Sequence, residues 1–264
     1  MILLIFFMAP ARADDLPRVV SLNLCADAYL MAFADKAQVL ALTPQSRDPS
    51  LSAFHAAAQD YPISDGQVEA IAALDPDLVI VSSYSDPMRN RLIGQLGYDI
   101  LVMDAADNYA AARAAISQLG AAIGREEAAQ DYGARLDAEM AAIAPLGAPV
   151  AILPLQRRNL TVGNGHILDE IIARAGALNT GRHIGAGMMS RVSLERALAD
   201  GADYILLNEG ADRPDSRGME FLTHPALKAA YPPEKRLVLN NNLLVCAGAT
   251  TPRAVGVLIE QLAD

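Results

Sequence analysis

Short apolar segments rich in β-branched residues alternate with helical patterns along most of this chain. Runs of this length bounded by turn residues are typical of buried strands, and the segments between them repeat apolar residues at helical spacing. In the first half we expect strands at 18–22, 39–42, 78–81 and 100–103, and helices at 26–34, 68–74 and 88–96. Alternating strands and helices imply a parallel sheet covered by helices, so the sequence predicts an α/β fold.

The alternation pauses once and then begins again. Residues 108–143 contain no Pro and are rich in Ala, Glu, Gln and Arg, which predicts one long helix or two abutting helices interrupted near Gly120 and Gly124. In the second half we expect strands at 150–154, 160–162, 204–207 and 237–239, and helices at 167–175 and from Pro252. The predicted organisation is an N-terminal lobe at 14–107, a linking helix at 108–145 and a C-terminal lobe at 146–264.

The two halves share a local signature at 68–80 and 194–206. In each copy a Glu, Glu69 or Glu195, opens a short helix, and an Asp precedes the buried strand that follows. The offset between these residues is the same in both copies, which predicts two related lobes. Ordinary α/β packing without any special role for the two Glu side chains is the alternative.

The amino terminus has the form of an export signal. Residues 1–8 are apolar, Pro10 follows, and Ala11-Arg12-Ala13 has the small-x-small pattern of a cleavage site. The apolar run is much shorter than the roughly 20 residues that a membrane-spanning helix needs. We therefore expect a signal peptide at 1–13 and a mature protein in the periplasm.

Charge and motifs narrow the classes of function. The formal net charge of −10 argues against a nucleic-acid surface, which needs clustered Lys and Arg. The sequence has no nucleophile elbow, phosphate-binding loop or His-Glu-x-x-His pattern, so an enzyme is not favoured. A chelatase-like enzyme and a sensory module that binds a partner protein stay as alternatives, because fold does not dictate function.

The opening segment 18–27 (RVVSLNLCAD), the two Glu units and the Pro-free linking segment together resemble the iron-complex and cobalamin class of periplasmic binding proteins. The resemblance covers nearly the whole mature chain. It implies two Rossmann-like lobes with parallel sheets, joined by a single long rigid helix, the class III arrangement, with a small metal chelate held between the lobes. It also implies an ABC permease dimer as partner, docked through Glu69 and Glu195. We expect a monomer with no cofactor of its own.

Ligand-binding residues are sought in the loops that follow the strands, because ligands of open α/β sheets bind beyond the carboxyl ends of the strands. The expected ligand-binding residues are Asn23, Leu24, Cys25, Arg47, Tyr84, Arg157, Arg158, Asn164, Met189, Arg191, Asn208 and Asn241.

Several of these expectations have a simpler alternative. Asn23 has the position of an ordinary helix cap, and Arg47 is equally suited to a local pair with Asp48. Tyr84 offers a ring with a hydroxyl, suited to lining the pocket of a large chelate. Adjacent Arg157 and Arg158 favour an anionic cargo, so we expect a ferric siderophore, with a corrinoid or haem as the alternative. The four His residues are dispersed and predict no bare metal site.

Cys25 and Cys246 fall in different lobes. An oxidising compartment allows a bond between them if their Cα atoms lie within about 7 Å. A bond across the cleft would oppose cargo release, so we expect two unbonded thiols.

Overall fold

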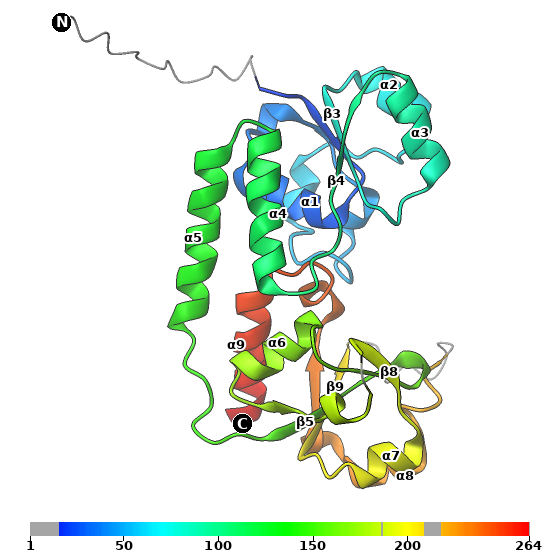
Figure 1. Cartoon of the computed structure of the whole chain (residues 1–264), viewed down its shortest axis with the longest axis vertical. Helices are drawn as coiled ribbons and strands as arrows, with labels where there is room; N and C mark the ends of the chain where they lie inside the picture. The colour runs from blue at the N-terminus through cyan, green and yellow to red at the C-terminus, as the bar shows by residue number, and fades with distance from the viewer. Residues whose placement is uncertain (1–15, 186, 209–217, 264) are drawn as a thin grey trace, which may run out of the picture.

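The computed structural model of the chain describes residues 16–185, 187–208 and 218–263 and has two α/β lobes stacked along its long axis (Figure 1). The elements of lobe 1 are β1 (Val19–Ser21), α1 (Leu24–Phe33), β2 (Val39–Ala41), α2 (Val68–Leu74), β3 (Leu78–Val81), α3 (Pro87–Gln95) and β4 (Asp99–Val102). The signal peptide expected at 1–13 lies outside the described residues. No described helix combines the length and the apolar character needed to cross a membrane.

Lobe 2 repeats the alternation of strands and helices and adds two strands to it. Its elements are β5 (Ala151–Gln156), β6 (Leu160–Val162), α6 (Ile167–Arg174), β7 (Leu178–Asn179), β8 (Met189–Arg191), α7 (Leu194–Ala199), β9 (Tyr204–Asn208), α8 (Pro225–Ala230), β10 (Arg236–Leu239) and α9 (Thr251–Ala263). Short 3₁₀ turns lie at Lys36–Gln38, Pro44–Arg47, Ala57–Asp60, Arg157–Asn159, Thr180–His183, Pro233–Lys235 and Asn241–Leu243.

The two sheets have the same parallel topology. Lobe 1 has the order β2-β1-β3-β4, and in lobe 2 the parallel pairs β7-β5, β5-β9 and β9-β10 give the corresponding order. Strands β6 and β8 are antiparallel and extend the lobe 2 sheet beside the end of β5. The predicted two-lobed α/β fold is confirmed, with this antiparallel extension as an addition that the sequence did not indicate.

In each lobe one Asp joins two neighbouring strands in the same way, which shows that the sequence repeat is also structural. We call this contact the aspartate clamp. The Asp77 carboxylate accepts a hydrogen bond from the backbone N of Arg18 at 2.7 Å, and the Asp203 carboxylate accepts one from Ala151 at 2.8 Å. Each Asp also donates its own backbone N–H to the carbonyl of the same partner, at 2.9 Å in both lobes. The two bonds fix the register of β1 against β3 and of β5 against β9.

The linking segment is a helical hairpin. Helix α4 (Tyr109–Ala122) turns back along lobe 1, and α5 (Glu126–Ala142) alone runs from lobe 1 to lobe 2 (Figure 1). The helices separate at Gly124, which has a positive φ of 66°, and they approach so closely that a Cβ on Gly120 would lie 2.4 Å from the Cβ of Ala129. Of the two alternatives expected for this segment, two abutting helices interrupted near Gly120 and Gly124 are found, and within the linking segment at 108–145 the single helix that joins the lobes is α5.

A continuous apolar core runs from one lobe to the other. It joins buried residues of α1, α4 and α5, such as Leu30 and Ile116, to residues of lobe 2 such as Ile171 and Leu258. Helix ends at this junction are also joined by polar contacts, since the Tyr109 backbone N donates to the Glu170 carboxylate of α6 at 2.8 Å. The two lobes therefore pack directly against each other and share one core.

The segment after β10 leaves lobe 2 and packs on α1 of lobe 1. There Cys246 is bonded to Cys25, with a Cα–Cα distance of 5.1 Å. The Tyr29 hydroxyl donates to the Ala247 carbonyl at 2.7 Å, and the Asn242 side-chain amide donates to the Pro49 carbonyl at 2.8 Å. The expectation of two unbonded thiols is wrong, because the bond joins surfaces that are already in contact and does not have to open for cargo to leave.

Replacing both cysteines, Cys25→Ser with Cys246→Ser, is expected to lower the free energy of unfolding by about 2–5 kcal/mol, because the bond closes a loop with a sequence separation of 221 residues. Urea denaturation of the exported protein and of the variant measures the difference. Titration of thiols in the unreduced, denatured protein is the control. A finding of two reactive thiols in the exported chain would contradict the bond.

Candidate functional site

The carboxyl ends of the two parallel sheets face each other across the junction of the lobes. Cys25 follows β1 and Pro49 follows β2 in lobe 1, and both contact the segment that follows β10 in lobe 2. Since ligands of α/β sheets bind beyond the carboxyl ends of the strands, the loops at these two facing edges form the candidate site.

Lobe 1 contributes Tyr84, from the turn between β3 and α3. The turn is fixed by hydrogen bonds, because the Ser83 backbone N donates to the Asp104 carboxylate at 2.8 Å and the Tyr84 backbone N donates to the Ser82 hydroxyl at 3.2 Å. These bonds from Ser83 and Ser82 lower the pKa of Asp104, which keeps it ionised. The Tyr84 side chain itself is 88% exposed. The expected ring and hydroxyl are therefore presented from a rigid turn.

Lobe 2 contributes three arginines on the antiparallel extension. Arg157 and Arg158 form the turn from β5 to β6, and Arg191 of β8 pairs across the ladder with Leu160. Arg158 adopts a left-handed conformation with φ of 62°, and its backbone N donates to the Gly218 carbonyl at 2.8 Å. All three arginines are exposed, and none makes an ion pair within the described parts of the chain. The site therefore carries three clustered cations able to attract an anion.

The same extension carries flexible apolar side chains and amides. Met188 and Met189 are 41% and 46% exposed, and the Met188 carbonyl accepts a hydrogen bond from the Gly163 backbone N at 2.9 Å. That bond places exposed Asn164 beside the methionines. Half-buried Asn208 and Asn241 lie at the carboxyl ends of β9 and β10. Methionine adapts to irregular ligand shapes, so these positions suit the edge of a bulky chelate.

Near α1 several of the expected ligand-binding residues have structural roles. Asn23 is buried, and its side-chain oxygen caps α1 by accepting from the backbone N of Cys25 at 2.9 Å and of Ala26 at 3.0 Å. Its amide donates to the Met103 carbonyl, so Asn23 also ties α1 to the residue that follows β4. Cys25 is in the disulfide, and its neighbour Leu24 is half-buried in the same first turn.

Arg47 also has a structural role. Its guanidinium donates to the Tyr61 carbonyl at 2.7 Å and to the Ala58 carbonyl at 3.2 Å, which closes the loop before α2. It does not pair with Asp48, whose carboxylate instead accepts from the Ser50 hydroxyl at 2.7 Å. The charge of Arg47 was visible in the sequence, but its partners come from a loop fold that no local pattern indicates.

Asp27 is a buried carboxyl directly behind the lobe 1 edge of the site. One carboxyl oxygen accepts from the Thr43 hydroxyl and from the Thr43 backbone N at 3.0 Å, and the other has no hydrogen-bond partner among the described residues. Burial raises the pKa of Asp27 to about 7. The proton that Asp27 retains near neutral pH is thus held between α1 and the end of β2.

Asp27→Asn is expected to remove a pH dependence of stability. Because the pKa of Asp27 is raised from 3.8 to about 7 on folding, the folded state binds more protons between these values, and stability falls as pH rises through them. The Asn variant lacks this loss, so above pH 7 it gains on the wild type by at most about 4 kcal/mol, at about 1.4 kcal/mol per pH unit. Urea unfolding at pH 4 and pH 8 measures it; equal pH profiles for both proteins would contradict the assignment.

The expected docking residues Glu69 and Glu195 occupy matched places in the two lobes. Each is exposed and lies in the first turn of its helix, α2 or α7. Backbone and Ser193 hydrogen bonds lower the pKa of Glu195, and the Ser193 hydroxyl caps α7 by accepting from the Arg196 backbone N at 3.2 Å. Both helices lie on the side of the molecule opposite α5 (Figure 1). The structure thus presents one acidic group from each lobe on this side.

Metal-binding side chains do not gather in the described residues: no group of three or more His, Cys, Asp or Glu is placed to hold an ion.

The chain can be compared with known proteins in three ways. Residues 19–230 match the sequence pattern of the family described as periplasmic binding protein. No protein with a curated description matches the sequence.

Solved structures with the same fold cover nearly the whole chain. The periplasmic haem-binding protein HutB of Vibrio cholerae superposes with a TM-score of 0.74 at 18% identity, covering 94% of this chain and 99% of that one. The periplasmic haem-binding protein RhuT of Roseiflexus sp. RS-1, in apo form, gives 0.71 at 20% identity, covering 92% and 98%. The vitamin B12-binding protein BtuF of Vibrio cholerae gives 0.63 at 20% identity, covering 94% and 97%.

Proposed function

Because the chain belongs to the periplasmic binding protein family, we propose that it captures an anionic iron chelate between its lobes and delivers it to the permease of an ABC importer. The observation that carries the proposal is the set of exposed polar side chains on the loops at the two facing sheet edges. Lobe 1 presents the phenol of Tyr84, and lobe 2 presents Arg157, Arg158 and Arg191.

The arginine cluster selects for negative charge. A guanidinium binds carboxylate and catecholate oxygens through its planar fork, and three such groups that make no ion pair among the described residues attract an anionic cargo and disfavour a cationic one. Tyr84 adds a hydroxyl that can donate a hydrogen bond or, as phenolate, bind ferric iron at an open position. Exposed Met188 and Met189 supply apolar contact for the body of the chelate.

Ferric catecholate siderophores and haem share this chemistry, since both are iron chelates that carry acidic oxygens. The haem-binding proteins with the same fold support haem as a cargo, and the cluster of arginines supports either source. A corrinoid is less well supported, because the chain contains no Trp to stack on a large macrocycle. No catalytic step is part of the proposal.

Export and delivery complete the proposed function. A signal peptide at 1–13 directs the chain to the periplasm, where it acts as a monomer. The exposed carboxylates of Glu69 and Glu195 meet a matched pair of basic side chains on the permease dimer, and such charge-assisted contacts fix orientation more than they add affinity.

Cargo binding is tested by absorbance titration of the mature protein with a ferric catecholate, a ferric hydroxamate, haem and cyanocobalamin. We expect one of the iron chelates to bind, and Arg157→Gln with Arg158→Gln to weaken its binding at least about tenfold, because each lost charge-assisted contact costs roughly 1.5–3 kcal/mol. Tyr84→Phe should alter the absorbance of the bound iron if the phenol coordinates it.

Arg91→Gln is the matched control for the arginine variant, since Arg91 is an exposed arginine in the middle of α3 and not in a loop that follows a strand. Its affinity for the chelate should equal that of the wild type. Binding of cyanocobalamin alone, or equal loss of affinity in the Arg91 variant, would contradict the assignment of an anionic iron cargo to this edge.

A further inference from the structure

Residues 240–250, which we call the strap, follow β10 of lobe 2 but pack on lobe 1. The strap is folded on itself, because the Thr250 hydroxyl donates to the Cys246 carbonyl at 2.8 Å. It also lies very close to α4, since a Cβ added to Gly248 would be 2.7 Å from the Cβ of Ala112, and Gly248 has a positive φ of 90°. The strap is therefore a compact segment seated on lobe 1.

The strap joins loops that belong to the candidate site in both lobes. Its Cys246 is bonded to Cys25, in the first turn of α1 shortly after β1. Its Asn242 donates to the carbonyl of Pro49, in the loop after β2. Asn23, which caps α1, donates to the carbonyl of the residue that follows β4. The bond between the two cysteines thus links the loops that follow β1, β2 and β4 of lobe 1 to the loop that follows β10 of lobe 2.

The disulfide is also the covalent tie on the strap side of the junction. The main chain crosses from lobe 1 to lobe 2 through α5, on the other side (Figure 1). The further contacts of the strap with lobe 1 are non-covalent, such as the hydrogen bond from the Tyr29 hydroxyl to the Ala247 carbonyl. Each such hydrogen bond has a small net free energy. Without the disulfide, the strap side of the junction would therefore open more easily.

We propose that the Cys25–Cys246 bond is a positioning element of the cargo site, which holds the loops of both lobes in the arrangement that binds the chelate. The inference rests on the proposed function and deepens it, because it makes cargo affinity depend on a bond behind the site. Without the bond, part of the population would have loops that no longer match the cargo. The apparent affinity then falls in proportion to the fraction that is still competent to bind.

The compartment in which the bond forms gives this dependence a function. Disulfides form in an oxidising periplasm and are kept reduced in the cytoplasm. A chain that needs the bond for its full affinity becomes an effective carrier only after export. Before export, the reduced chain would compete poorly for iron chelates inside the cell.

Binding to the oxidised protein and to a variant without the bond tests the proposal. Cys25→Ser with Cys246→Ser is titrated with a ferric catecholate, a ferric hydroxamate and haem. We expect the chelate that the exported wild type binds to be bound at least about fivefold more weakly by the variant, which corresponds to a competent fraction of about one fifth.

The wild-type chain allows the same comparison without any substitution. Protein made without its signal peptide in a reducing cytoplasm, and purified without oxygen, should bind as weakly as the serine variant. Oxidised glutathione then closes the bond: the two thiols of the protein lose two protons and two electrons, and the glutathione disulfide is reduced to two thiols. After removal of glutathione, the affinity should equal that of the exported protein.

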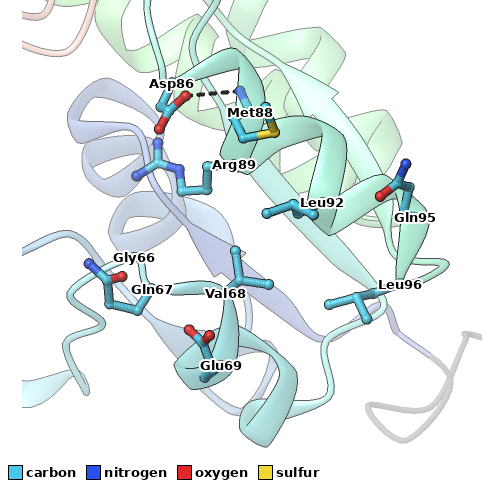
Figure 2. Close-up of a pocket in the computed structure, with 10 residues that line it drawn as sticks. All are labelled: Gly66, Gln67, Val68, Glu69, Asp86, Met88, Arg89, Leu92, Gln95 and Leu96. Atoms are coloured by element: carbon cyan, nitrogen blue, oxygen red, sulfur yellow. Dashed lines mark hydrogen bonds between the residues drawn. The ribbon is translucent and has the colours of Figure 1, made fainter.

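Helices α2 and α3 offer a matched control for the loss of stability. A groove of about 550 Å³ separates their outer sides, with Val68 and Leu92 on its two walls (Figure 2). Their inner residues Ile71 and Ile93 belong to a core cluster whose described members all lie in lobe 1. Ile93→Ala removes buried apolar contacts there and lowers the free energy of unfolding by an amount similar to the loss of a disulfide. Its affinity for the chelate should equal that of the wild type.

Tyr29→Phe tests the same positioning without touching the cysteines, and decides the matter if the serine variant does not fold. Tyr29 is only 2% exposed, so its hydroxyl cannot contact cargo. The substitution removes the hydrogen bond from α1 to the strap and keeps the ring. We expect an affinity for the chelate about twofold or more below that of the wild type, because less of the population is competent to bind.

The distance between the lobes gives a readout that needs no cargo. Nitroxides are attached to genetically encoded ketone residues that replace Gln95 of α3, at the rim of the groove in Figure 2, and Lys228 of α8 in lobe 2. Both positions are exposed. We expect double electron–electron resonance to show a distance distribution at least about twice as broad in the serine variant as in the oxidised protein, because more arrangements of the lobes are populated.

The outcomes separate this inference from the proposed function. Equal affinities of the oxidised protein and the serine variant, or distance distributions of equal width, would overturn the positioning role and leave the carrier function standing. An equal loss of affinity in Ile93→Ala would also overturn it, because stability alone would then explain the effect. If the oxidised wild type binds none of the three chelates, the proposed cargo is rejected, and the distance distributions still decide whether the bond fixes the lobes.

Discussion

The contact between the segment after β10 and helix α1 determines the geometry on which the rest of the molecule depends. Here the Cys25–Cys246 bond, the Tyr29 hydroxyl on the Ala247 carbonyl and a continuous apolar core tie the lobes together. Helix α5 holds the other side of the junction (Figure 1). Lobes fixed at two places cannot hinge freely, so the sheet edges that face each other are held in register before any cargo arrives, and little ordering cost remains to be met on binding.

Because the lobes are fixed, the proposed binding of cargo and docking to the permease fall on two separate surfaces. In the proposed function, capture falls to the facing edges, which carry Tyr84 on lobe 1 and the turn with Arg157 and Arg158 on lobe 2. Delivery would fall to the exposed acidic groups at the first turns of α2 and α7. Because both helices pack directly on the sheets whose edges form the candidate site, a partner seated on them is well placed to sense or disturb the cargo. The Asp27 carboxyl is buried between α1 and Thr43 and joins the lobe 1 edge of the candidate site to the core.

The sequence predicted the features of the fold that depend on local, periodic patterns of residues. The repeat around Glu69 and Glu195 indicated two related lobes, and the Asp77 and Asp203 clamps show why the same Asp is needed before each strand. The disulfide was not predicted, since nothing in a local pattern reports which segments 221 residues apart meet in space. The helix cap that the sequence offered as the alternative for Asn23 is present, because an Asn directly before a helix is a strong capping signal.

The most direct test of the account is uptake of radioactive iron, supplied as a ferric catecholate, a ferric hydroxamate or haem, by cells of the native organism that lack this chain. The account predicts that uptake of one of these chelates is lost, that the wild-type chain restores it, and that a Glu69→Gln, Glu195→Gln variant does not restore it although it still binds the chelate. Unchanged uptake of all three in cells without the chain would contradict the account.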